Sequence, residues 1–98
     1  MIEVRMTPTF RDWLRGLRDR QARVRVQARI RRIADGNPGQ YRNLGNGVSE
    51  MKIDYGPGYR LYYTQRANVL VILLCGGDKS TQVQDIAAAE RLANESEE

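Results

Sequence analysis

Residues 48–75 contain three consecutive runs in which side chains alternate as they do in β-strands. A Gly-Pro-Gly turn separates the first two runs, and residues 65–68 separate the second from the third. The first two runs place apolar and polar residues on opposite faces. Residues 69–75 are apolar on both faces, which is typical of a central strand covered on both sides. The segment therefore predicts a three-stranded antiparallel meander.

The first hairpin of this meander groups charged and aromatic side chains on one face. A three-residue Gly-Pro-Gly loop would pair Asp54 with Arg60 and Lys52 with Tyr62 across the strands. Lys52 and Arg60 would then be diagonal neighbours, on the face that also carries Glu50. The remaining alternate side chains, mostly apolar, would face the core.

The N-terminal half predicts a strand followed by two helices. Residues 2–6 alternate as a short strand, and Thr7 followed by Pro8 is typical of a helix start. Apolar residues at helical spacing then predict a helix to about residue 18. Residues 22–30 fit both a strand and a helix, but their Ala, Arg and Gln content and the Asp-Gly-Asn-Pro-Gly stop that follows favour a second helix antiparallel to the first.

The remaining segments complete a single domain. Residues 36–47 are rich in Gly and Asn and predict a loop. A helical pattern from Thr81 predicts a C-terminal helix that packs on the sheet, and residues 94–98 predict a frayed acidic tail. We therefore expect one α+β domain over residues 1–98. It has an N-terminal strand, two antiparallel helices, a three-stranded meander completing one sheet, and a C-terminal helix.

Basic residues concentrate in the N-terminal half, where residues 1–47 hold eleven arginines and four acidic residues. Arginine binds phosphate bidentately, so this bias suits nucleic acid, although a GC-rich genome produces the same bias. The exposed side of the second helix is either a solvated face or a surface that binds rRNA, mRNA or an acidic partner. The candidate RNA-binding residues on it are Arg20, Arg23, Arg25, Arg31 and Arg32.

Several classes of site are excluded by what the sequence lacks. The chain has no histidine and a single cysteine, which excludes a zinc cluster and a Ser-His-Asp triad, so we expect no metal and no cofactor. Residues 76–80 lack the spacing of a phosphate-binding loop. Cys75 lies in an apolar run, which predicts a buried, reduced thiol. No apolar run is long enough to span a bilayer and no leader opens the chain, so we expect a cytoplasmic protein without membrane contact.

The charged face of the hairpin suits RNA cleavage. Attack by the 2′-OH needs a base, cations that stabilise the phosphorane-like transition state and an acid for the leaving 5′-oxygen. Arg60 suits the charge-stabilising role. Lys52 and Lys79 suit phosphate binding or proton transfer, and Tyr62 or Asp54 would share the proton transfer. The alternative is a solvated sheet face on which Asp54 and Arg60 form only an exposed ion pair.

The order of these elements resembles the RelE/ParE toxin superfamily. The segment GVSEMKIDYGPGYRLYY followed by VILLCGGDKSTQVQDI is similar to its "addiction module killer protein" branch, often labelled HigB-like. The resemblance covers nearly the whole chain. It implies a toxin bound by a small antitoxin, usually a helix-turn-helix DNA-binding protein, in a toxin–antitoxin hetero-oligomer. The apolar strand 69–75 would agree with a sheet partly covered by that antitoxin or by a second copy.

The resemblance also implies an activity and its residues. RelE-like and HigB-like members bind the ribosomal A site and cut mRNA without metal, whereas ParE-like members inhibit DNA gyrase. Arg60 matches the strand arginine placed for the scissile phosphate, and Lys52 matches the basic position on the preceding strand. Lys79 lies among the functional positions after the last strand. Beyond what the resemblance implies, we expect Tyr62 to stack a base or to orient the 2′-OH.

One departure concerns acid–base chemistry. Several HigB-type nucleases carry catalytic histidines, and this chain has none. We therefore expect a histidine-free, ribosome-dependent mRNA interferase, an endoribonuclease that acts by 2′-OH attack and depends largely on positioning. The alternatives are a ParE-like, non-enzymatic inhibitor of gyrase and a basic binding domain without toxicity.

Overall fold

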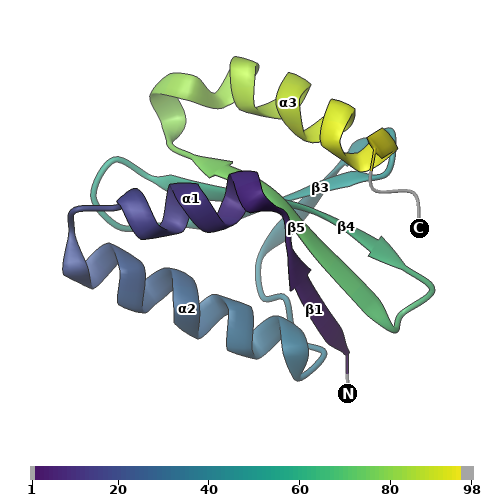
Figure 1. The fold of residues 1–98 in the computed structure, drawn as a ribbon. Helices are drawn as coiled ribbons and strands as arrows, with labels where there is room; N and C mark the ends of the chain where they lie inside the picture. The colour runs from purple at the N-terminus through teal and green to yellow at the C-terminus, as the bar shows by residue number, and fades with distance from the viewer. Residues whose placement is uncertain (1, 96–98) are drawn as a thin grey trace.

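Five strands form one mixed sheet with helices on both faces in the computed structural model, which describes residues 2–95 (Figure 1). The strand order is β1-β5-β4-β3-β2, with β1 parallel to β5 and every other neighbouring pair antiparallel. In chain order the elements are β1 (Glu3–Met6), α1 (Pro8–Gly16), α2 (Arg20–Ala34), β2 (Tyr41–Gly45), β3 (Val48–Ile53), β4 (Tyr59–Arg66), β5 (Leu70–Gly77), the 3-10 turn η1 (Lys79–Thr81) and α3 (Gln82–Glu95).

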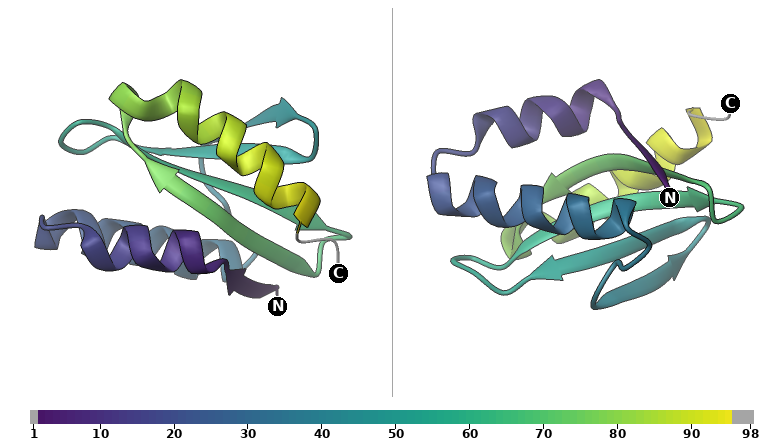
Figure 2. Two further views of the ribbon diagram at one scale, coloured as in Figure 1. Left: turned by 45° about the horizontal axis from the view of Figure 1, so that its top comes forward. Right: turned by 90° about the horizontal axis from the view of Figure 1, so that it is seen from below.

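The predicted α+β architecture is confirmed at this level. The N-terminal strand, the two antiparallel helices and the C-terminal helix are all present, and α1 and α2 lie on the face of the sheet opposite α3 (Figure 2). Thr7 caps α1 as predicted, because its Oγ1 accepts a hydrogen bond from the Phe10 amide at 3.0 Å. The same hydroxyl donates to the Leu74 carbonyl at 2.6 Å, which fastens the start of α1 to β5.

The prediction of a loop over residues 36–47 was wrong in its second half. Residues 41–45 form β2, so the meander has four strands rather than three. β2 is an edge strand with mostly exposed side chains, and its YRNLG sequence has no apolar alternation that would identify a strand. The first helix also ends two residues earlier than predicted, at Gly16.

The register of the first hairpin differs from the prediction by two residues. β3 and β4 pair Lys52 directly with Arg60, and Ile53 with Tyr59. The predicted pairs of Asp54 with Arg60 and of Lys52 with Tyr62 were therefore wrong.

The cause of this shift is a longer loop, because residues 54–58 all lie outside the ladder. The amide of Gly58 donates to the carbonyl of Tyr55 at 3.1 Å, and Gly56 and Gly58 adopt positive φ angles of 57° and 82°. The Tyr55 hydroxyl donates to Asp19 Oδ2 at 2.9 Å, so this loop is also tied to the start of α2. A shift of two residues keeps the alternation, so Lys52 and Arg60 stay on the same face.

Each face of the sheet has its own buried cluster. Helices α1 and α2 cover one, formed by Phe10, Val26, Ile33, Met51, Ile53, Leu61, Tyr63, Val71 and Leu73. Helix α3 covers the other, formed by Val48, Tyr62, Ile72, Leu74, Cys75, Ala89 and Ala93. Both faces of β5 are therefore covered by the chain's own helices. The apolar character of this strand is therefore explained without an antitoxin or a second copy, and such a partner stays a prediction.

The end of β5 is packed closely on both sides. A Cβ atom at Gly76 would lie 2.4 Å from Trp13 Cε3, and one at Gly77 would lie 1.8 Å from Asp85 Oδ2. Contacts this short are incompatible with a side chain. The two glycines therefore let α1 and α3 approach the same strand from opposite faces.

We predict that Gly76→Ala destabilises the fold by about 1–3 kcal/mol, because the new methyl group forces the Trp13 indole out of its packed position. Thermal or urea unfolding measures this. Gly16→Ala is the matched control, since no atom lies within 4 Å of a Cβ at Gly16 and the change is expected to be neutral or stabilising. Equal stability of Gly76→Ala and the wild type would contradict the packing.

The thiol of Cys75 is buried, as the sequence predicts, and Sγ lies 3.4 Å from the Asp85 carbonyl oxygen. Burial raises the pKa of the thiol from 9.0 to about 12. Between pH 9 and pH 12 the unfolded chain therefore loses this proton while the folded chain keeps it, so stability falls as the pH rises.

We expect the unfolding free energy of the wild type to fall relative to Cys75→Ala by up to about 1.4 kcal/mol per pH unit above pH 9. Below pH 9 the difference between the two proteins is expected to stay constant. Urea unfolding from pH 7 to pH 11 measures both regions. Parallel stability curves across this range would show that the buried thiol has no such raised pKa.

Two further expectations concern the acidic C-terminal tail and the absence of a membrane-spanning segment. Asn94 and Glu95 belong to α3, and residues 96–98 of the predicted frayed tail lie outside the described residues. Within residues 2–95, no helix has both the length and the apolar character needed to cross a membrane.

Candidate functional site

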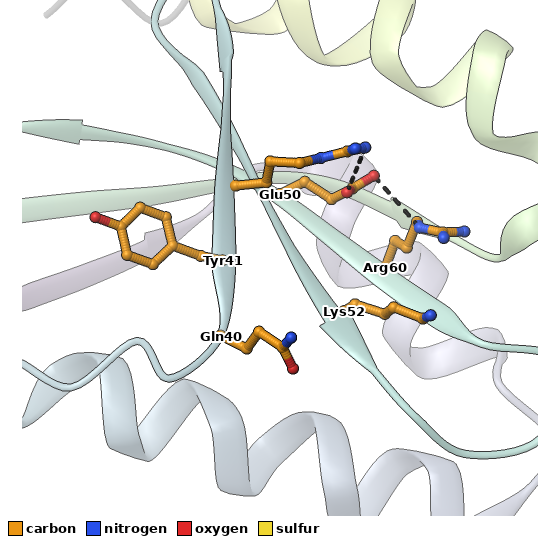
Figure 3. Close-up of a pocket in the computed structure, with 6 residues that line it drawn as sticks. Gln40, Tyr41, Glu50, Lys52 and Arg60 are labelled. Carbon is orange, nitrogen blue, oxygen red and sulfur yellow. Dashed lines mark hydrogen bonds and ion pairs between the residues drawn. The ribbon is translucent and has the colours of Figure 1, made fainter.

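Lys52 and Arg60 lie side by side at a cavity of about 290 Å³ beside the edge strand β2 (Figure 3). Their side chains extend from β3 and β4 toward the same side, whereas the ring of Tyr41 points away from them. The cavity is lined by Gln40, Tyr41, Arg42, Glu50, Lys52 and Arg60. Three cations and one carboxylate give this lining a net charge of +2, which suits an anion.

Arg60 is the most enclosed cation of this cavity. Its side chain is 11% exposed, and Nε lies 3.3 Å from Glu50 Oε2. Nε and Nη1 are buried, and neither has a hydrogen-bond partner among the described residues. Nε faces Glu50, whereas Nη1 has no acceptor among the described residues, and a buried cationic donor without an acceptor is costly.

Glu50 lies beneath these cations and is almost fully buried. Its Oε1 accepts a hydrogen bond from Arg42 Nη2 at 3.1 Å, and its Oε2 accepts one from Gln82 Nε2 at 3.0 Å. These donors come from β2 and from the first residue of α3. The side chains around Arg60 thus link three strands and a helix.

Lys52 and Lys79 continue the basic surface beyond Arg60. Lys52 Nζ lies 3.4 Å from Asp54 Oδ1, and both side chains are exposed. Lys79 is exposed in η1 and lines a second hollow of about 370 Å³, to which Lys52 and Arg60 also contribute. The structure therefore brings together three of the four predicted catalytic residues.

Tyr62 does not belong to this group. It is fully buried beneath α3, and its hydroxyl has no hydrogen-bond partner among the described residues. Burial, reinforced by the charge of Glu50, raises its pKa above the usual range for tyrosine. A buried ring cannot stack on a base, and a hydroxyl that holds its proton this firmly is a poor acid. The predicted role of Tyr62 is thus wrong: the alternation placed it correctly, but α3 covers it.

The predicted RNA-binding arginines all lie on α2, across the sheet from Arg60. Arg20, Arg31 and Arg32 are exposed. Arg23 is half-buried and donates to the Leu17 carbonyl, and the guanidinium of Arg25 lies 4.6 Å from the centre of the Tyr55 ring. The structure separates this group from the cavity, and its RNA binding stays a prediction.

Arg29 is a positioning residue that the sequence did not distinguish from its neighbours. Nη1 donates to the Lys52 carbonyl at 2.9 Å, and Nη2 donates to the carbonyls of Pro38 and Gln40 at 3.0 and 3.1 Å. Burial, followed by the charge of Arg32, lowers the pKa of Arg29. Arg29 thereby fixes β3 and the segment that leads into β2, which together carry most of the cavity wall.

Arg42 was missed as part of the site, and Glu50 was placed on the correct face but given no role. Arg42 was assigned to a loop, so nothing in the sequence placed it across from Glu50. Glu50 and Lys52 are two residues apart on the same strand, and this spacing was the one indication in the sequence that Glu50 faces the cavity. Among residues 2–95, no three His, Cys, Asp or Glu side chains are grouped closely enough to hold a metal ion.

Comparison with known proteins gives one relative of high similarity. The chain is 47% identical over 94 residues to a protein of Haemophilus influenzae named "Uncharacterized protein", covering 96% of this chain and 95% of the relative. This chain belongs to the same family as that Haemophilus influenzae protein. Identity this high over nearly the whole chain means that the two proteins share a fold. No family model matches the chain, and no solved structure matches it.

The position of Tyr62 leads to a prediction for this family's fold. Tyr62→Phe is expected to leave the melting temperature unchanged or to raise it by a few degrees, because the lost hydroxyl makes no hydrogen bond among the described residues. Tyr62→Ala is expected to lower stability by about 3–5 kcal/mol through the cavity it leaves. Thermal unfolding of both variants tests this, and a large loss in Tyr62→Phe would show that the hydroxyl is needed.

Proposed function

We propose that this protein is the toxin of a type II toxin–antitoxin module and cleaves translated mRNA on the ribosome. The observation that carries the proposal is the enclosed guanidinium of Arg60, whose Nη1 has no acceptor among the described residues, at a cavity whose lining has a net charge of +2. A phosphodiester is the anion of RNA, and cleavage builds up further negative charge on its oxygens. The predicted RelE/ParE-like fold is supported by the order of strands and helices.

Arg60 would stabilise the phosphorane-like transition state. The 2′-oxygen attacks the adjacent phosphorus, the bond to the 5′-oxygen breaks, and the products are a 2′,3′-cyclic phosphate and a free 5′-hydroxyl. The guanidinium of arginine stays charged and is more weakly hydrated than a lysine ammonium, so it suits an enclosed phosphate site better. Enclosure and the ion pair with Glu50 restrain the Arg60 side chain before a substrate binds.

Lys52 and Lys79 flank Arg60 and would complete the chemistry. Both line the hollow beside Arg60, so each would reach a phosphate or a proton in transfer. Their exposure allows them to contact a substrate that the ribosome presents. Removal of the 2′-OH proton and protonation of the 5′-oxygen would be shared by these lysines and by the ribosome-bound RNA.

The proposal includes partners and a compartment. A toxin of this kind is held inactive by a small antitoxin, for which a helix-turn-helix DNA-binding protein is expected, and both act in the cytoplasm with the ribosome and mRNA. The arginine-rich face of α2 is available for rRNA or for an acidic antitoxin segment.

Primer extension on cellular mRNA, minutes after induction, tests the activity. The wild type is expected to produce cuts within translated codons, and Arg60→Lys is expected to reduce the cutting rate by about 10²–10³-fold. Lysine keeps a positive charge beside the buried Glu50, so this variant avoids the destabilisation that Arg60→Ala would cause.

The matched control is Arg5→Lys, because Arg5 is exposed on β1 at the opposite edge of the sheet. This control is expected to cut as the wild type does. Wild-type growth arrest with intact mRNA would contradict the proposal and would direct the assay to inhibition of gyrase supercoiling, the ParE-like activity. Harmless expression of the wild type would indicate a binding domain without toxicity.

A further inference from the structure

Glu50 is a buried carboxylate in the middle of a basic site. Its side chain is 6% exposed, and its oxygens face donors from three elements: Arg42 on β2, Arg60 on β4 and Gln82 on α3. Arg42 contacts Oε1, whereas Arg60 and Gln82 contact Oε2. One carboxylate therefore holds both arginines that line the cavity.

A buried carboxylate is unexpected in a site that would bind an anion, because the two negative charges repel each other. Burying this charge costs free energy that its pairs only partly recover, and its negative charge weakens the attraction of the site for phosphate. It also restrains two long side chains, each of which would lose about 2 kcal/mol of rotamer entropy on binding a ligand. Because Glu50 orders the two arginine side chains before a ligand binds, less of this entropy is lost on binding, and this gain offsets the cost of burying the carboxylate.

The geometry leaves parts of both guanidiniums available to a ligand. Glu50 faces Nε of Arg60 and Nη2 of Arg42. Nη1 of Arg60 is also buried, which leaves Nη2 of this guanidinium for a ligand. The Arg42 side chain is 64% exposed, whereas that of Arg60 is 11% exposed. One arginine therefore lies within the cavity and the other at its open edge.

Resting on the proposed function, we infer that Glu50 is a positioning residue. It organises Arg60 and Arg42 as a two-arginine clamp for consecutive phosphates of single-stranded RNA. With Lys52 beside the two arginines, the cavity lining has a net charge of +2, which matches two phosphodiesters with one negative charge each. Arg60 holds the scissile phosphate, and Arg42 holds the next phosphate along the strand, which sets the register of the cut.

The role of Glu50 has a kinetic signature. Glu50→Gln keeps the size of the side chain but removes its charge, so Arg60 loses its restraint while the site becomes more positive. Cleavage of ribosome-bound mRNA is expected to slow by about 10²-fold, as for a small misplacement of a catalytic group. The Kd of the purified protein for a short 2′-O-methyl RNA is expected to stay the same or to decrease, because removing the negative charge of Glu50 offsets the lost restraint of the arginines.

A purely structural role for Glu50 gives a different result. In that case cleavage and RNA binding by Glu50→Gln would fall together and only in proportion to the folded fraction, which the melting curve measures. That outcome, or an unchanged cleavage rate, would overturn the positioning role.

The role of Arg42 is tested separately, because its exposed side chain can be changed without unfolding the protein. Arg42→Gln is expected to weaken binding of the 2′-O-methyl RNA and to reduce the slope of log Kd against log salt by about 0.7, the value for one phosphate of a single strand. Arg5→Gln on β1 is the matched control and is expected to leave the slope unchanged. An unchanged slope in Arg42→Gln would overturn the clamp.

The clamp and the nuclease activity fail in distinguishable ways. A wild type that binds the RNA with the Arg42-dependent slope but cuts no mRNA would contradict the nuclease and leave the clamp supported. A nuclease whose cleavage and RNA binding are unaffected by Arg42→Gln and Glu50→Gln would retain the proposed function and overturn the clamp. A wild type that neither binds nor cuts RNA would overturn both.

Discussion

Gly76 and Gly77 lie where α1 and α3 press on β5 from opposite faces, with Trp13 against the first glycine and Asp85 against the second. Gly77 on β5 is the β-ladder partner of Arg60 on the neighbouring strand β4. The close approach of α3 to Gly77 therefore occurs beside the candidate site. It brings Gln82, the first residue of α3, within hydrogen-bond distance of Glu50. The site is therefore built on the packing of two helices around one strand, although neither glycine lines the cavity.

The charge arrangement follows from this packing. Because α3 covers Tyr62 and leaves Lys52 exposed, the same face of the sheet changes from apolar to basic within a few residues. Arg60 lies at this boundary, with its alkyl chain and much of its guanidinium enclosed. An enclosed cation next to an open cavity interacts more strongly with an anion than a fully solvated cation does, because water screens it less.

Much of the fold follows from sequence periodicity, and the errors have identifiable physical causes. Thr7, Pro8 and the alternating strands gave correct element types, because caps and burial patterns are local. The hairpin register depended on whether Tyr55 belongs to the strand or to the loop. The hydrogen bond from the Tyr55 hydroxyl to Asp19, which is distant in sequence, helps to hold Tyr55 in the loop. β2 was missed because an edge strand with polar side chains has no burial pattern to detect. For the same reason Arg42 was not expected at the site, and the covering of Tyr62 depended on how α3 docks.

The most direct test of the account is the structure of the wild-type protein bound to a ribosome whose A-site codon carries 2′-O-methyl groups that block cleavage. The account predicts that Arg60 lies within about 3 Å of the oxygens of one codon phosphate, with Lys52 beside it and Arg42 at the adjacent phosphate. A complex in which the α2 arginines contact the mRNA and the Arg60 cavity faces away from it would contradict the account. Failure of the protein to occupy the A site would contradict it as well.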